Sequence, residues 1–283
     1  MKLATVLTAA GTRAGIVGAS SIELLEYDDA LVALRLLDSG ADLGTLPRVG
    51  EIALEEARFA PPIIRPEKII CVGLNYYGHA AEANLPVPST PMLFSKYTRA
   101  MVGARDNIQI PSVTEKCDWE VELGVIIGST GRNIATKDAL EMVAGYSVIN
   151  DITMRDWQKR TSQFLPGKTF EGSTPFGPWL VSPDEVDHAR DLRLRCLVNG
   201  EVMQESSTSD MIFDVADVIA YVSEVITLVP GDVIAMGTPS GIGSTRTPPV
   251  FLQPGDTVIS EIEGLGVLEN LCVPAGEGEI NYV

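Results

Sequence analysis

Residues 117–128 read CDWEVELGVIIG, a run in which two carboxylates interrupt an apolar strand pattern. Side chains alternate between the faces of a β-strand, so Glu120 and Glu122 share one face while Val121 and Leu123 share the other. Adjacent carboxylates on an apolar strand are costly unless a cation neutralises them. The run predicts either the exposed acidic edge of a half-buried strand or a site for a hard cation such as Mg²⁺, Mn²⁺ or Ca²⁺.

Similar short apolar runs on both sides of this stretch indicate a structure rich in β-strands. They are bounded by Gly, Pro or Asn and read KIICVGL, YSVINDI, RLRCLVNG, DVIAMG and TVISEIEG. Helical patterns are fewer, and the clearest are residues 28–37, GHAAEANL, TKDALEMVAGY and FDVADVIAYVSEVITL. Because strands and helices do not alternate regularly, the sequence predicts a strand-dominated α+β fold.

Prolines are concentrated in FAPPIIRPEK, residues 59–68, which indicates a boundary between two parts of the chain. We place this boundary near residue 60. The expected organisation is a small N-terminal domain over residues 1–60 and a larger domain over residues 61–283.

The charge and composition narrow the classes of ligand. The 21 Lys and Arg residues against 38 Asp and Glu residues give a formal charge of −17, which repels nucleic acids and anionic membranes. No apolar run approaches the roughly 18 residues of a membrane span. Cysteines far apart, with no C-x-x-C pair, indicate reduced thiols in a cytoplasmic protein. The sequence therefore predicts a soluble cytoplasmic protein that binds a small molecule. Neither G-x-G-x-x-G nor a P-loop occurs, which disfavours NAD and ATP.

Two further features could add chemistry to the paired glutamates. Asp151 ends an apolar strand pattern and is either a third oxygen ligand or an ordinary turn or N-cap residue. His79 lies three residues before Glu82, so on a helix the carboxylate can fix the imidazole tautomer and raise its basicity. That pair is either a general base acting on water or a structural histidine beside an exposed glutamate.

Several polar residues could face an anionic substrate. Lys168, in a glycine- and proline-rich stretch, is either a surface charge or a donor to a substrate oxyanion or carboxylate. Arg155 and Gln158 could bind an anion if the segment after Asp151 is helical. The run AMGTPSGIG around Thr238 offers backbone N–H groups to a carboxylate.

Five segments, taken in order along the chain, resemble the fumarylacetoacetate hydrolase family. They span about residues 67–272 and read KIICVGLNYYGHAAE, CDWEVELGVIIG, GYSVINDITMRDWQ, GKTFEGSTPFGPWLV and LVPGDVIAMGTPSGIG. The resemblance implies a mixed β-roll catalytic domain, a homodimer, and a divalent Mg²⁺, Mn²⁺ or Ca²⁺ ion bound by Glu120, Glu122 and Asp151. Asn75 stands near the place where eukaryotic fumarylacetoacetate enzymes carry a further acidic ligand, so we expect three carboxylate ligands.

The resemblance also implies roles for the other candidates. His79 and Glu82 correspond to a pair that activates water, and Lys168 corresponds to the lysine of the substrate loop. Substrate-binding positions of the family correspond to Arg155, Gln158 and Thr238.

The implied activity is hydrolysis of the C–C bond of an acylpyruvate, a 2,4-dioxo acid of the fumarylpyruvate or maleylpyruvate type, in the degradation of aromatic compounds. A 2-oxo acid can chelate a metal ion through its carboxylate and keto oxygen. The same chemistry serves oxaloacetate decarboxylation and 2-hydroxyhepta-2,4-diene-1,7-dioate isomerisation, which stay open as alternatives. The His79–Glu82 pair favours hydrolysis or decarboxylation over isomerisation. A module that binds a metal or keto acid without turnover is the non-enzymatic alternative.

Overall fold

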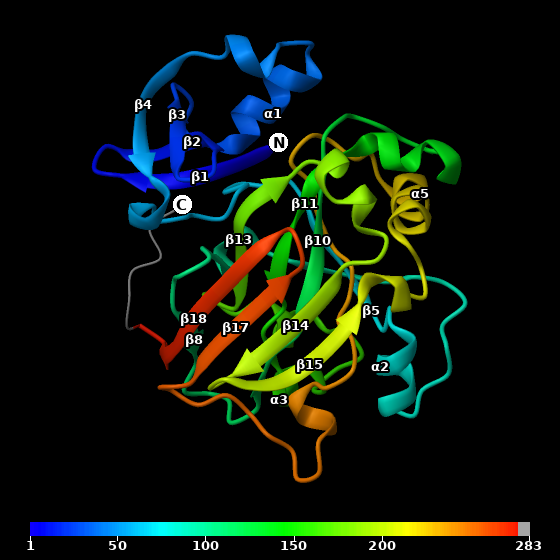
Figure 1. Ribbon diagram of the computed structural model, residues 1–283. Helices are drawn as coiled ribbons and strands as arrows, with labels where there is room; N and C mark the ends of the chain where they lie inside the picture. Colours follow the sequence, from blue (N-terminus) through cyan, green and yellow to red (C-terminus); the bar gives the residue numbers. More distant parts are fainter. Residues whose placement is uncertain (277–283) are drawn as a thin grey trace.

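The computed structural model describes residues 1–276 as layered β-sheets with few helices (Figure 1). Residues 277–283, the end of the predicted larger domain, lie outside the described residues. The sheet-dominated arrangement confirms the predicted α+β fold class.

The largest sheet within residues 1–276 runs from the N-terminal strands through the centre of the molecule (Figure 1). Its order is β4-β3-β2-β1-β13-β11-β10-β16-β5-β6, and β7 pairs with β13. The strand bounds are β1 Lys2–Thr8, β2 Gly11–Val17, β3 Ser21–Leu25, β4 Arg48–Ala53, β5 Ile69–Gly73, β6 Met92–Lys96, β7 Met101–Val102, β10 Val121–Ile127, β11 Val143–Asn150, β13 Thr174–Val181 and β16 Val233–Ala235. Because β1 pairs with β13, the N-terminal strands continue the sheet of the predicted larger domain. The boundary near residue 60 stays a prediction.

A second sheet covers one face of the first. Its order is β15-β14-β17-β18-β8, and Figure 1 shows β15, β14, β17 and β18 side by side. The bounds are β8 Ile108–Ile110, β14 Arg193–Val198, β15 Glu201–Ser207, β17 Thr257–Ile262 and β18 Gly266–Pro274. Val121 and Leu123 of β10 share a hydrophobic core with Leu194 and Val258 of this sheet. Burying each such side chain contributes roughly 1.5–3 kcal/mol.

Strand β10 is therefore buried on both faces, because its other face belongs to a second core that includes Ile126 and Ile149. Glu120 is 5% exposed and Glu122 is 1% exposed. The first alternative from the sequence, an exposed acidic edge, is wrong. Both carboxylates lie inside the protein.

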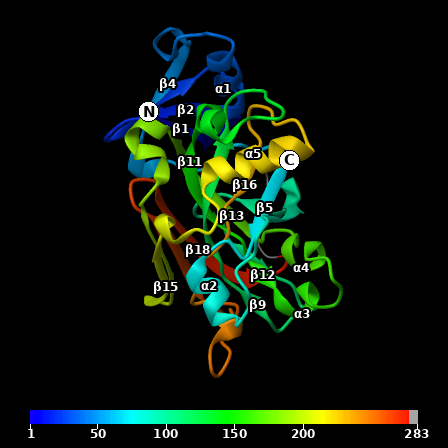
Figure 2. The same ribbon diagram turned by 90° about the vertical axis from the view of Figure 1, so that its right-hand side faces the viewer.

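The helices are short and lie around the sheets. Their bounds are α1 Ala30–Asp38, α2 Tyr77–Glu82, α3 Arg155–Gln158, α4 Leu165–Lys168 and α5 Val215–Val225. Figure 2 shows α3 and α4 next to each other at the lower end of the molecule. None of the helices in the described residues is long and apolar enough to cross a membrane.

The helix predicted for TKDALEMVAGY is largely wrong. Thr136–Met142 forms a 3₁₀-helix, and the chain then enters β11 at Val143. Tyr146 on β11 is fully buried and pairs with Val125 on β10. Pairing with a buried neighbouring strand therefore outweighs the local helical pattern.

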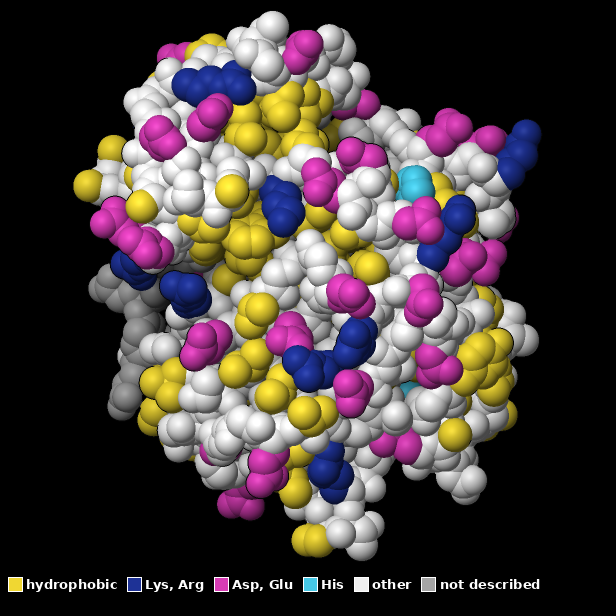
Figure 3. All heavy atoms as spheres, in the orientation of Figure 1, with side chains coloured by type: hydrophobic (Ala, Val, Ile, Leu, Met, Phe, Trp, Pro, Cys, Tyr) yellow, Lys and Arg dark blue, Asp and Glu magenta, His cyan; other side chains and the backbone are white. Residues whose placement is uncertain are grey.

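Hydrophobic side chains gather in a hollow between the N-terminal strands and the second sheet (Figure 3). Phe59, Pro178 and Trp179 are among the residues that line a cavity of about 600 Å³ there. The rings of Phe59 and Trp179 meet edge to face, with their centroids 5.5 Å apart. This contact joins the segment before β5 to strand β13.

Candidate functional site

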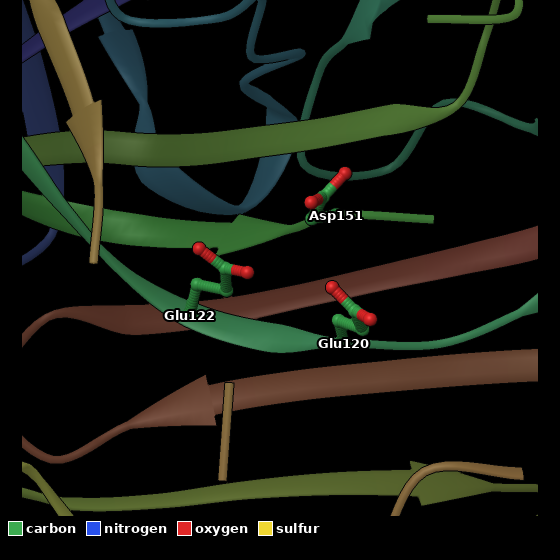
Figure 4. Close-up of side chains that lie close together, drawn as sticks. All are labelled: Glu120, Glu122 and Asp151. Carbon is green, nitrogen blue, oxygen red and sulfur yellow. The ribbon is translucent and has the colours of Figure 1, made fainter. Parts of the chain in front are cut away.

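Three carboxylates from neighbouring strands meet inside the protein. Glu120, Glu122 and Asp151 each offer an oxygen within 4.8 Å of the others, and all three residues are buried. Figure 4 shows the side chains of Glu120 and Glu122 extending from one strand toward Asp151, which follows the adjacent strand. The structure therefore brings together the three carboxylates that the sequence analysis named as candidate metal ligands.

The pairing of β10 with β11 explains this convergence. Val121 pairs with Asn150 and Glu122 pairs with Ile149. The contact continues beyond the strands, because the Asp151 N–H donates to the Glu120 carbonyl over 2.8 Å and the Asn150 side chain accepts from the Glu120 N–H over 2.9 Å. The backbone therefore holds the three carboxylates at one end of the ladder.

Three buried cations surround the carboxylates. Lys168 Nζ donates to Glu120 Oε2 over 2.6 Å and to Asp151 Oδ2 over 2.7 Å. Arg155 Nη2 lies 2.7 Å from Glu120 Oε1. Lys96 Nζ donates to Asp151 Oδ1 over 2.5 Å, and both of those side chains are fully buried. Lys168 is thus a buried partner of the carboxylate cluster, and the surface-charge alternative for it is wrong.

The surroundings of Glu120 and Glu122 shift the pKa values of these two carboxyl groups in opposite directions. Burial favours the protonated form of Glu120, but Lys168 and Arg155 outweigh it and lower the pKa of Glu120 below its usual value. Among the described residues, Glu122 has no such ion-pair partner. Burial, followed by the charges of Asp151 and Glu120, raises the pKa of Glu122 well above its usual value. Without a further cation, the surroundings of Glu122 therefore favour its protonated form more than water does.

These residues fit a hard divalent cation. Three buried carboxylates offer the oxygen ligands that such ions prefer, and in the described part of the chain no lysine or arginine forms an ion pair with Glu122, whose pKa is raised by burial and by the charges of Asp151 and Glu120. The Gly237 N–H fixes Glu122 Oε2 over 2.8 Å. Gly237 has a φ of +87°, and a Cβ there would lie 2.8 Å from the Val72 carbonyl oxygen, so only glycine suits this position.

His79 and Glu82 form the predicted pair on the short helix α2. Nδ1 of His79 lies 2.7 Å from Glu82 Oε1. Glu82 also accepts hydrogen bonds from the Gly241 N–H and the Thr245 hydroxyl. Burial alone raises the pKa of Glu82, but these bonds, first among them the one from His79, lower it below the usual value. The ionised Glu82 therefore orients the His79 ring through Nδ1. Nε2 is the ring nitrogen that takes no part in this contact.

The segment after Asp151 is helical, as the prediction for Arg155 and Gln158 required. Arg155 Nε donates to Asp118 Oδ2 over 2.7 Å, and Arg155 Nη1 donates to Gln158 Oε1 over 3.1 Å. Asp118 is fully buried and also accepts from the Gly243 N–H. Asp118 thus orients Arg155 beside Glu120.

Thr238 lies beside β10 with its hydroxyl already bonded. The hydroxyl donates to the Val121 carbonyl over 2.9 Å and accepts from Gln204 Nε2 over 2.8 Å. Contact between Thr238 and a substrate stays a prediction.

One cavity of about 350 Å³ connects most of the predicted site residues. Among those residues its lining includes His79, Glu120, Glu122, Arg155, Gln158, Lys168 and Thr238. Asp151 and Glu82 lie behind this wall and reach it through their bonds to Lys168 and His79. The cavity therefore places a histidine, two members of the carboxylate cluster and two buried cations around one space.

Sequence reasoning missed Lys96. Lys96 ends β6, where a lysine after an apolar run looks like an ordinary strand terminus. Its partner Asp151 is distant in sequence, so no local signal marks the pair. The second histidine of the chain, His188, lies away from this site: it is half-buried and its Nδ1 lies 3.4 Å from the Tyr146 hydroxyl.

Comparisons with known proteins agree with this geometry. Residues 68–273 match the sequence profile of the fumarylacetoacetate (FAA) hydrolase C-terminal family. A mitochondrial oxaloacetate tautomerase of Bos taurus is 45% identical over 254 residues, which cover 89% of this chain and 79% of that relative.

Solved structures show the same fold. A fumarylacetoacetate hydrolase from psychrophilic Exiguobacterium antarcticum is 38% identical, with a TM-score of 0.85 and coverage of 97% of this chain and 99% of that chain. A 2-hydroxyhepta-2,4-diene-1,7-dioate isomerase from Mycobacterium marinum is 32% identical, with a TM-score of 0.79 and coverage of 98% and 100%. These relatives carry different activities on one architecture, so the reaction of this chain has to be argued from its site.

Proposed function

The chain belongs to the fumarylacetoacetate hydrolase family, and from this premise we propose that it is a metal-dependent enzyme that interconverts the keto and enol forms of oxaloacetate or a close 2-oxo dicarboxylic acid. The observation that carries the proposal is that His79, oriented by Glu82, lines the same cavity as Glu120 and Glu122. The similarity to a bovine oxaloacetate tautomerase supports this substrate class. This proposal replaces the preference for acylpyruvate hydrolysis drawn from the sequence.

The reaction moves one proton between carbon and oxygen. His79 Nε2 accepts the proton from C3 of the keto acid, while Glu82 accepts from Nδ1–H and stabilises the resulting imidazolium. The electron pair of the C3–H bond forms the C2–C3 double bond, and the negative charge develops on the C2 oxygen. Lys168 stabilises that oxygen, and the imidazolium returns the proton to it. When bound by Glu120, Glu122 and Asp151, Mg²⁺ or Mn²⁺ supplies Lewis-acid polarisation of the 2-oxo group.

Acylpyruvate hydrolysis is a second candidate, supported by the apolar wall of the cavity. Leu85, Met92, Phe94 and Phe164 also line the cavity and offer apolar surface to an acyl chain. In that reaction the His79–Glu82 pair would act on water rather than on C3. Oxaloacetate decarboxylation is the third possibility, since it uses the same 2-oxo dicarboxylic acid.

One assay separates these reactions. The purified protein with Mg²⁺ or Mn²⁺ is mixed with the enol form of oxaloacetate, and the loss of enol absorbance is followed beside pyruvate release and acylpyruvate consumption. We expect fast enol loss without matching pyruvate release. His79→Ala should slow this step by about 10²–10⁴-fold while keeping metal binding. His188→Ala is the matched control, because His188 is not part of the cavity lining. Pyruvate release that matches enol loss, or equal rates in both variants, would overturn the proposal.

We also propose a homodimer and a cytoplasmic location, as the sequence and its resemblance suggest. A role in the degradation of aromatic compounds belongs to the acylpyruvate candidate and is proposed only together with it. The bovine relative is a mitochondrial protein, so the location in particular calls for a direct test. Light scattering after size exclusion gives the oligomeric state, and fractionation of the source cells gives the location.

A further inference from the structure

We propose that Lys159 binds the distal carboxylate of the substrate and so gives the site its preference for dicarboxylic over monocarboxylic 2-oxo acids. This inference rests on the function proposed above and identifies a specificity residue for the same cavity. Lys159 lines the cavity together with Arg155 and Lys168. The resemblance to the family gave no role to Lys159.

Lys159 lies one helical turn after Arg155. The Lys159 N–H donates to the Arg155 carbonyl over 3.2 Å, so the α3 turn continues to Lys159. Residues four apart lie on the same side of a helix, about 6 Å apart along its axis. Arg155 is 5% exposed and contacts Glu120, whereas Lys159 is exposed. Lys159 therefore lies at the outer rim of the cavity, one turn from the carboxylate cluster.

Lys159 differs from Arg155 and Lys168 in its ion-pair partners. Arg155 and Lys168 are neutralised by carboxylates, as the contacts to Asp118, Glu120 and Asp151 show. Among the described residues, Lys159 has no carboxylate within ion-pair distance. It is thus the cavity cation that is available to a second substrate charge.

The proposed function fixes the direction of the substrate. Because its 2-oxo group is placed beside Glu120 and Glu122, the distal carboxylate is directed away from these two residues, toward the rim of the cavity. Two other donors at the wall are engaged, because the Thr245 hydroxyl donates to Glu82 and the Ser244 N–H donates to Asp118. In a chain of formal charge −17, a second negative charge needs a local cation to bind.

The adjacent Arg160 provides a matched control. It is also exposed and cationic, but its guanidinium stacks 3.6 Å from the centroid of the Trp157 ring and it is not part of the cavity lining. Removing the charge of Arg160 changes the net charge of the chain by the same amount as removing that of Lys159. A difference between the two variants therefore reports position and not total charge.

The test compares the binding of malate and lactate, which differ in the distal carboxylate, by calorimetry on the Mg²⁺-loaded protein. Lys159→Met should weaken malate binding by roughly 5- to 10-fold and lactate binding by less than about 2-fold. Lys159→Arg should retain the malate preference, and Arg160→Met should leave both affinities unchanged. Added salt should reduce the malate preference of the wild type.

Two outcomes separate this inference from the proposed function. If Lys159→Met keeps the wild-type ratio of malate to lactate affinity, the role of Lys159 is wrong even if the enzyme tautomerises oxaloacetate. If the ratio falls as expected but the wild type does not accelerate the tautomerisation, the proposed reaction is wrong and the dicarboxylate preference stands. A wild type that binds neither ligand overturns both.

Discussion

Replacing Lys96 by Met tests the electrostatic account of the carboxylate cluster. Lys96 Nζ contacts Asp151 Oδ1 at 2.5 Å, and both side chains are 0% exposed. Removing one partner of a buried ion pair typically costs about 3–5 kcal/mol. Lys168 still pairs with Asp151, so we expect a loss at the lower end of this range, about 3 kcal/mol, without a divalent metal. Met retains the apolar volume of the lysine stem.

Urea unfolding with and without saturating Mn²⁺ measures this loss. Deleting a positive charge beside a candidate ligand strengthens the attraction of the cluster for a divalent cation. Mn²⁺ should therefore stabilise Lys96→Met more than the wild type, by about 1.4 kcal/mol for tenfold tighter binding.

Lys68→Met is the control for this measurement. Lys68 Nζ lies 3.0 Å from Oδ2 of the buried Asp232, which is outside the carboxylate cluster. This variant should lose stability, but Mn²⁺ should stabilise it no more than the wild type. A loss below about 1 kcal/mol in Lys96→Met, or equal rescue of both variants, would refute the reasoning.

Two further predictions concern carboxyl groups. Glu122→Gln removes a carboxylate charge that burial and Asp151 disfavour, so urea unfolding without metal should show no loss of stability while Mn²⁺ affinity, measured by calorimetry, falls at least about 100-fold. The folded-state pKa of Glu82 is lowered from 4.5, so Glu82 stabilises the fold above about pH 4.5 and loses this effect as pH falls through its folded pKa. Glu82→Gln should flatten the fall of unfolding free energy on acidification, and an unchanged slope contradicts this account.

The carboxylate cluster could be predicted from sequence because it depends on local geometry. Alternation along a strand places Glu120 and Glu122 on one face, and a strand end places Asp151 at a rim. The i,i+3 spacing likewise brings His79 to Glu82. Each of these contacts needs one element or two neighbouring strands, and such elements have a clear pattern.

The cations and the burial could not be predicted in the same way. Lys96 reaches Asp151 across 55 positions of sequence, and a strand-terminal lysine has no pattern that names its partner. Whether Glu120 and Glu122 are exposed depends on the segments that pack on their own face of β10, such as α3 and α4 with Arg155 and Lys168, which is a tertiary feature. The 3₁₀-helix at Thr136–Met142 gives way to β11 for the same reason, because strand pairing decides where the helical pattern stops.

The pairing of β1 with β13 bears on how the catalytic part could be isolated. Lys2 and Leu3 lie against Val181 and Leu180, so the N-terminal strands occupy an edge of the sheet that also contains β10 and β11. A chain shortened to begin at residue 61 would uncover that edge and offer unpaired backbone groups to another molecule. Such a truncation would yield aggregates in place of a minimal enzyme, even though every residue of the proposed active site would still be present.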